Sequence, residues 1–209
     1  PGGGGPGRGG RAPPPAGCGG CAPAGRSGGS PLPAGMYKVN TWLAAADEHV
    51  SGVLYMGEVL DWRRRLAILI TRSGDGLPFL LFLGALVLFG SPQWRVIAIS
   101  LFLADVLTFL VVQTLKFLIR RGRPAGEWGQ MYRRLDPYSF PSGHSARGGA
   151  MAAMSLLVAP TWFGLILLAW GLAVALSRVL LGVHYFSDAV SGFALGVAMS
   201  LALWLFVVG

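Results

Sequence analysis

The chain has 209 residues, of which 53% are hydrophobic and 12% charged. This apolar excess excludes an ordinary soluble globular domain and predicts an integral membrane protein. The net charge is +8, but the basic residues flank apolar segments instead of forming a polar basic face, so nucleic acid is not an expected partner.

The first 35 residues are mostly Gly, Pro, Ala and Ser without periodicity. Such a composition buries too little apolar surface to offset the entropy of ordering. We expect residues 1–35 to be a disordered extension, with Met36 as a candidate natural start, and residues 36–209 to form a membrane-embedded domain. Cys18 and Cys21 form a C-x-x-C motif here, but without a second ligand pair they predict neither a zinc nor a redox site.

Residues 39–62 interleave apolar and charged side chains. This pattern predicts an amphipathic helix that lies on the membrane or packs against a helical bundle. The basic cluster Arg63, Arg64 and Arg65 follows, then the short apolar sequence LAILI and the helix-breaking sequence RSGDGLP.

Five apolar segments follow, at residues 77–90, 96–119, 145–159, 162–181 and 189–208. They show no strand alternation and predict an all-α bundle with five membrane spans, or six if the first helix also inserts. Because consecutive spans alternate in direction, the connections at 120–140 and 182–187 must share one membrane face. Trp94 and Trp162 fall on the opposite face, as in an aromatic belt.

Three polar motifs fall on the shared face. K-x6-R-P runs from Lys116 to Pro124, P-S-G-H ends at His144, and S-R-x5-H-x3-D runs from Ser177 to Asp188. The first and third motifs supply three cations that would converge on one anion, and arginine has the geometry to bind phosphate with two hydrogen bonds. These cations are Lys116, Arg123 and Arg178.

The remaining motif residues predict phosphoryl chemistry. Ser142 and Gly143 open a helix, so their backbone N–H groups and the helix dipole would point at the same anion. His184 and Asp188 are four residues apart, which would let the carboxylate hold the imidazole Nδ1–H and leave Nε2 free to attack phosphorus. His144 could then protonate the leaving oxygen.

The three motifs resemble the signature of the type 2 phosphatidic acid phosphatase (PAP2) superfamily, which includes vanadium haloperoxidases, glucose-6-phosphatase and lipid phosphate phosphatases. The resemblance implies a helical PAP2/haloperoxidase-like core and a phosphohistidine at His184, assisted by Asp188. It implies that His144 acts as acid and later as base, and that no metal or cofactor is needed. The implied phosphate-binding residues are Lys116, Arg123, Arg178, Ser142 and Gly143.

These features predict a metal-independent phosphohydrolase that acts on a lipid phosphate or diphosphate in the bilayer, such as phosphatidate, phosphatidylglycerol phosphate or polyprenyl diphosphate. A lipid phosphotransferase would use the same phosphohistidine and stays an alternative. A vanadate-dependent haloperoxidase is disfavoured by the spans, because those relatives are soluble. A non-catalytic lipid-binding protein is disfavoured by the complete set of motif residues.

Several residues near the motifs have no assigned role. Arg120 and Arg121 lie close to the site in sequence, and Asp105 inside the second apolar segment is expected to make a structural hydrogen bond. Glu127, Trp128, Tyr132, Arg133 and Arg134 are candidates for a lid that recognises the headgroup.

The membrane side of the site is predicted differently by two arguments. The resemblance places the site on the non-cytoplasmic face of the plasma membrane. The excess of arginine on the same face favours the cytoplasm by the positive-inside rule.

Overall fold

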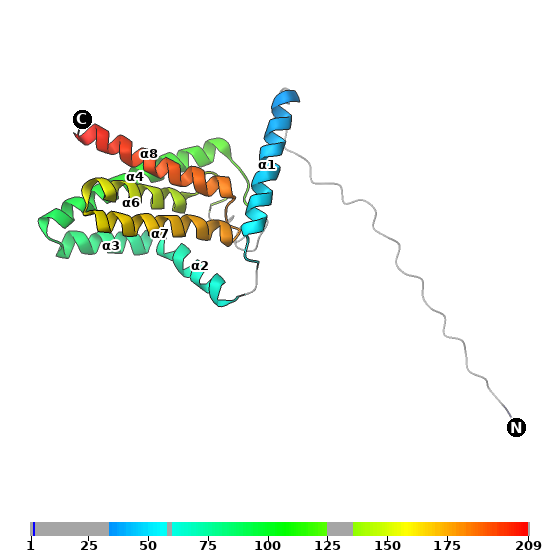
Figure 1. Ribbon diagram of the computed structural model, residues 1–209, viewed down its shortest axis with the longest axis horizontal. Coiled ribbons are helices and arrows are strands. Elements are labelled where there is room, and N and C mark those ends of the chain that lie inside the picture. Colours follow the sequence, from blue (N-terminus) through cyan, green and yellow to red (C-terminus); the bar gives the residue numbers. More distant parts are fainter. Residues whose placement is uncertain (1, 3–33, 58–59, 125–135, 209) are drawn as a thin grey trace.

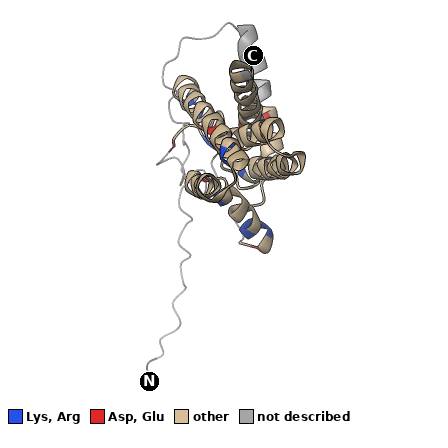
Figure 2. Ribbon diagram, turned by 90° about the vertical axis from the view of Figure 1, so that its left-hand side faces the viewer, with Lys and Arg blue, Asp and Glu red and all other residues tan. Residues whose placement is uncertain are grey.

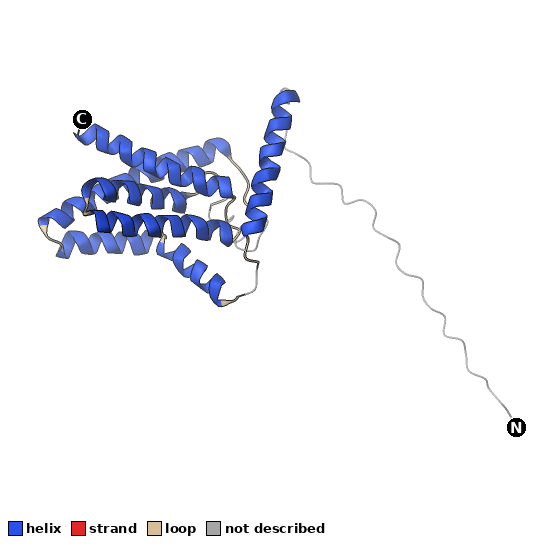
Figure 3. Cartoon of the chain, viewed as in Figure 1, coloured by secondary structure: helices blue, strands red, loops and turns tan. Residues whose placement is uncertain are grey.

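The computed structural model describes residues 2, 34–57, 60–124 and 136–208. Within these ranges every regular element is a helix, which confirms the predicted all-α class (Figure 3). The predicted extension at 1–35, apart from Gly2 and the first residues of α1, lies outside the described residues, as do the C-x-x-C cysteines and the five candidate lid residues.

Helix α1 spans Ala34–Leu54 and lies crosswise over one end of the bundle (Figure 1). The predicted amphipathic helix at 39–62 therefore extends too far, because the helix ends at Leu54. Gly57 has a φ of 75°, a left-handed conformation that interrupts a helix and that glycine adopts readily. The Met56 N–H donates to the Leu180 carbonyl at 3.0 Å, which fixes the chain against the end of α7.

Helices α2 (Trp62–Ser73) and α3 (Gly76–Phe89) form a pair bent by 55° at a short break. The Asp61 side chain caps α2 by accepting a hydrogen bond from the Arg64 N–H at 2.8 Å. The basic cluster thus lies in the first turn of α2, where Figure 2 shows a blue group at the helix end. The short apolar sequence after it belongs to the same helix.

The bundle consists of α3, α4 (Pro92–Ile119), α6 (Gly143–Val158), α7 (Thr161–Leu180) and α8 (Phe186–Val208), which match the five predicted apolar segments. Among the described residues, α4, α7 and α8 are long and apolar enough to cross a membrane, and α2 with α3 qualifies as a fourth span if the pair forms one bent span. Helix α6 has only 16 residues and packs against α4, α7 and α8.

Glycines allow α6 to pack closely against both of its neighbours. A Cβ on Gly149 would lie 2.1 Å from the Phe193 carbonyl oxygen of α8, and one on Gly148 would lie 2.8 Å from the Gly171 Cα of α7. Small residues at such contacts let membrane helices approach backbone to backbone. The close packing fixes the N-terminus of α6, which carries the P-S-G-H motif, between α7 and α8.

The described parts of the connection from α4 to α6 (120–124 and 136–142) and the connection from α7 to α8 lie at the same end of the bundle, next to α1 (Figure 1). The Trp94 and Trp162 rings lie at the other end, with centroids 6.2 Å apart in an edge-to-face arrangement. This arrangement brings the three polar motifs together.

Candidate active site

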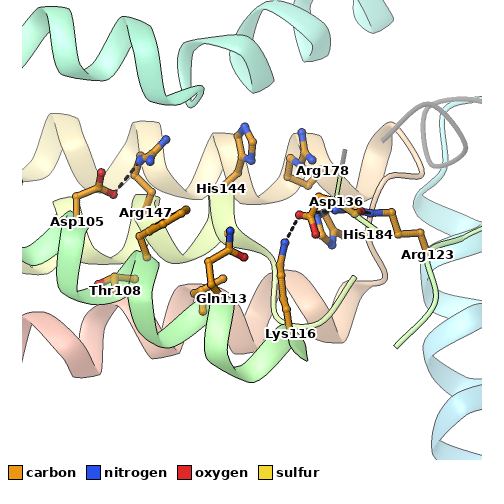
Figure 4. A pocket seen from close by; sticks show the side chains of 13 residues that line it. Asp105, Thr108, Gln113, Lys116, Arg123, Asp136, His144, Arg147, Arg178 and His184 are labelled. Carbon is orange, nitrogen blue, oxygen red and sulfur yellow. Dashed lines mark hydrogen bonds and ion pairs between the residues drawn. The ribbon is translucent and has the colours of Figure 1, made fainter. Parts of the chain in front are cut away.

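A cavity of about 240 Å³ lies at the motif end of the bundle, between α4, α6 and α7 (Figure 4). Six of the eight predicted site residues line it, and they come from all three motifs. These are Lys116, Arg123, Gly143, His144, Arg178 and His184.

The three cations lie on different segments. Lys116 lies in the last turn of α4, Arg178 in the last turn of α7, and Arg123 in the connection after α4. All three are at most 4% exposed. Burying positive charge is costly unless a negative group lies close to it.

Asp136 supplies a negative group that sequence reasoning missed. Its carboxylate accepts hydrogen bonds from Lys116 Nζ and from Arg123 Nη2, the latter at 2.8 Å, and its backbone carbonyl accepts one from Arg123 Nε at 2.7 Å. The side chain is 33% exposed. A signal was available, because three converging cations need a counter-charge and few acidic residues lie between the first two motifs.

The groups around His184 favour its neutral form, with the lone pair on Nε2. The Arg123 Nη1 lies 3.1 Å from His184 Nε2, and a guanidinium can only donate, so Nε2 accepts and carries a lone pair. Burial, followed by the charges of Arg178 and Arg123, lowers the pKa of His184 well below its ordinary value. A neutral imidazole with a lone pair on Nε2 is the form required for nucleophilic attack.

Asp188 lies beside His184 in the first turn of α8 and is fully buried. Its Oδ2 is 3.6 Å from His184 Nδ1, longer than a hydrogen bond, and accepts from the Tyr185 N–H at 3.0 Å. The structure therefore brings the predicted pair together and leaves a gap that a small movement would close.

Ser142 differs from the prediction. Its N–H donates to the Asp188 carbonyl at 3.0 Å, and its hydroxyl caps α6 by accepting from the Ser145 N–H at 3.5 Å. Because these groups fix the second motif to the third, the Ser142 amide is used inside the protein and does not face the cavity. Gly143 alone of the predicted pair lines the cavity.

His144 has a partner that the motifs did not reveal. Its Nε2 lies 2.8 Å from Oδ1 of Asp75, in the break between α2 and α3. An ionised carboxylate only accepts, so Nε2 carries the proton in this pair. The sequence signal was weak, because Asp75 belongs to a helix-breaking sequence where acidic residues commonly occur as helix caps.

An ion pair between Arg147 and Asp105 lines the end of the cavity away from Lys116. Arg147, one turn after His144 on α6, donates from Nε to Asp105 of α4 at 2.8 Å and from Nη1 to the Gly74 carbonyl at 2.8 Å. The predicted hydrogen bond of Asp105 within the bundle is confirmed. Asp105 and Arg147 also line the cavity, which extends along α4 from Lys116 to Asp105 (Figure 4).

Comparisons with known proteins show to which family the chain is similar. The model of the PAP2 superfamily matches residues 96–209. An undecaprenyl-diphosphatase of Sulfolobus acidocaldarius is 31% identical over 106 residues, which cover 49% of this chain and 51% of that relative. A lipid A 1-phosphatase of Rhizobium johnstonii is 33% identical over 108 residues, or 48% of this chain and 44% of the relative. The chain thus spans about half the length of the curated relatives it matches.

Solved structures share the fold. A transmembrane PAP2-type phosphatidylglycerolphosphate phosphatase of Bacillus subtilis superposes with a TM-score of 0.63 at 25% identity, covering 79% of this chain and 86% of that one. Aquifex aeolicus LpxE superposes with a TM-score of 0.59 at 20% identity, covering 74% and 92%, and supports the fold alone. The family match contains all three motifs and every residue that lines the cavity, and the chain belongs to the PAP2 superfamily.

Proposed function

We propose that this protein is an integral-membrane phosphatase that removes phosphate from a lipid phosphate or diphosphate through a phosphohistidine on His184, without a metal. One observation carries the proposal: a buried His184, whose Nε2 accepts a hydrogen bond from Arg123, lines the same cavity as three buried cations. A nucleophile next to fixed positive charge suits phosphoryl transfer, because the cations stabilise the charge of the transferring group.

The first step forms a bond between His184 Nε2 and phosphorus and breaks the bond from phosphorus to the leaving oxygen. His144 in its protonated form gives a proton to that oxygen and becomes neutral. Burial and the charge of Arg178 lower the pKa of His144 to about 4, and Asp75, 2.8 Å from its Nε2, opposes them by favouring the protonated form. Lys116, Arg123 and Arg178 stabilise the charge on the transferring group, which is most spread out in the transition state. Asp188 supports the proton on His184 Nδ1 once the 3.6 Å gap has closed.

The second step releases phosphate. Water attacks phosphorus, His144 accepts its proton, and the bond between phosphorus and His184 Nε2 breaks to restore the neutral imidazole. An acceptor alcohol in place of water would make the enzyme a phosphotransferase, so the identity of the acceptor is part of the test.

The substrate class is a lipid whose phosphate reaches the end of a membrane bundle. Named activities of the relatives concern undecaprenyl diphosphate, lipid A and phosphatidylglycerol phosphate. We therefore propose phosphatidate, phosphatidylglycerol phosphate and polyprenyl diphosphate as the first candidates, in the plasma membrane, with the site on the non-cytoplasmic face.

Phosphate release from these three lipids by the detergent-purified protein, with a chelator present, tests the function. We expect release by the wild type, none by His184→Ala, and full activity in the matched variant His49→Ala, which changes an exposed histidine on α1. Release by His184→Ala would rule out the phosphohistidine. A wild type that releases phosphate from none of the lipids would refute the hydrolase.

Cysteine labelling in intact cells tests the membrane side. In a background with Cys18→Ser and Cys21→Ser, Glu48→Cys reports the site end and Arg95→Cys the opposite end, and both positions are exposed. We expect a membrane-impermeant maleimide to label Glu48→Cys only. Labelling of Arg95→Cys alone would place the site in the cytoplasm, as the arginine distribution suggests.

A further inference from the structure

Helix α1 lies outside the residues matched by the family model, yet it contributes a carboxylate to the surroundings of the catalytic pair. Asp47 of α1 accepts hydrogen bonds from the Ser187 N–H at 2.9 Å and from the Ser187 hydroxyl at 2.6 Å. Ser187 directly precedes Asp188, so these hydrogen bonds connect α1 to the start of α8.

Arg121 joins the same two segments to a third. Its Nη1 donates to Asp188 Oδ1 at 2.8 Å and to the Ser187 hydroxyl at 2.7 Å, and its Nη2 donates to the Asp47 carboxylate. The guanidinium carbon also lies 4.2 Å from the centroid of the Tyr185 ring. One arginine thus connects α1, the connection after α4 and the start of α8.

The charges in this network are suited to holding Asp188. Burial alone would raise the pKa of Asp47, but hydrogen bonds from Ser187 and Arg121 outweigh it and lower that pKa below its ordinary value. Asp47 therefore stays ionised and pairs with one side of Arg121. The other side of Arg121 faces Asp188, which is fully buried and needs a positive partner.

The contacts also orient the Asp188 carboxylate. Arg121 holds Oδ1, while Oδ2 is the oxygen 3.6 Å from His184 Nδ1. Rotation of the carboxylate would break the Arg121 bond and the Tyr185 bond together. The position of Oδ2 relative to the imidazole therefore depends on Arg121.

We propose that Arg121 and Asp47 are positioning residues, through which helix α1 orients Asp188 toward His184. The proposal rests on the proposed function for its kinetic consequence. Direct phosphate binding by Arg121 is the competing explanation, but Arg121 does not line the cavity formed by the described residues, and its Nη1 and Nη2 are bonded to carboxylates.

Two variants and two matched controls test the proposal. Arg121→Ala removes the connection, and Asp47→Asn removes the α1 charge with little change in shape. Arg120→Asn removes the neighbouring exposed cation with a residue that tolerates the left-handed conformation there, and Glu48→Gln removes the neighbouring exposed carboxylate. We expect kcat to fall about 10-fold to 100-fold in Arg121→Ala with KM nearly unchanged, and less in Asp47→Asn, whereas both controls keep wild-type values.

The Asp188→Asn background separates positioning from binding. If Arg121 acts through Asp188, adding Arg121→Ala to Asp188→Asn causes little further loss of kcat, because residues that act as a unit are not additive. A rise in KM with unchanged kcat, or a full additional loss in the double variant, would overturn the proposal in favour of direct binding.

An NMR measurement tests the proposal independently of enzyme activity. The chain has three histidines, so the labelled imidazole of His184 can be assigned by NMR. We expect its resonance to shift in Arg121→Ala and Asp47→Asn and to stay unchanged in Arg120→Asn. An unshifted His184 resonance in both test variants overturns the inference, whether or not the wild type releases phosphate. Absence of phosphate release would refute only the proposed function.

Discussion

The two ends of the helical bundle are built from opposite kinds of side chain. At the site end, buried charges are held by ion pairs that involve α1, α4, α6, α8 and the connection after α4. At the other end, aromatic rings pack edge to face, and an apolar groove of about 610 Å³ runs between α3 and α7 toward Trp94 and Trp162.

The different side chains at the two ends indicate that the site end determines reactivity and the aromatic end contributes mainly to stability. Contacts between buried charges depend on geometry, so small displacements change reactivity. Aromatic contacts depend mainly on buried area and tolerate substitution by residues of similar size. Changes at the site end should therefore reduce turnover in a folded protein, and changes at the aromatic end should alter stability without altering turnover.

The largest effect is expected from Arg178→Ala. This substitution removes a buried cation from the cavity, and loss of one group that stabilises a transition state typically costs about 100-fold to 1000-fold in kcat. Phosphate release and size-exclusion profiles would be measured side by side. Retained activity in a normally eluting variant would contradict the role of Arg178, and an aggregated variant would contradict the proposed separation of the two ends.

His144→Ala should cost about 100-fold or more with a lipid substrate, because the leaving oxygen loses its proton donor. With p-nitrophenyl phosphate the loss should be much smaller, since nitrophenolate leaves without a proton. The ratio of the two activities is the measurement. An equal loss on both substrates would show that His144 does not act as the acid.

The imidazole of His184 should stay neutral as the pH falls through 6.5, because burial followed by Arg178 and Arg123 lowers its pKa. Its loss of nucleophilicity is therefore expected only at lower pH. An NMR titration checks this, and Arg123→Gln should move the transition to higher pH by removing one of the charges. A wild-type transition near the ordinary histidine value of about 6.5 would be inconsistent with this account.

Asp136→Asn should strengthen the binding of phosphate analogues by about 10-fold, because the substrate no longer competes with a carboxylate for Lys116 and Arg123. Inhibition by vanadate measures this, with Asp61→Asn, a cap of α2, as a control that also removes one negative charge. Weaker vanadate inhibition in Asp136→Asn would mean that Asp136 organises the cations instead of competing for them.

The smallest effect is expected from Trp162→Leu. The ring makes edge-to-face contacts with Trp94 and Phe163, and such pairs contribute about 1 kcal/mol each beyond the buried area. The melting temperature should fall by a few degrees while kcat and KM stay unchanged. A fall in kcat comparable to that of the site variants would show that the two ends are coupled.

The helices of the bundle could be predicted because each follows from a continuous apolar segment, and the five observed helices match the five segments. The end of α1 could not, because it depends on the backbone conformation of Gly57 and on a hydrogen bond to Leu180. Apolar periodicity continues beyond Leu54 in the sequence and carries no information about either contact.

The fold class and the candidate site residues follow from the order of residue types alone, because apolar segments and the three polar motifs are patterns at fixed spacing. The partners that hold those residues depend on tertiary packing. Asp75, Asp136 and Arg121 meet motif residues that lie 13 to 69 positions away in the chain, and Arg121 pairs with Asp47, which lies 74 positions away. The packing of helices, which no local spacing encodes, sets such contacts.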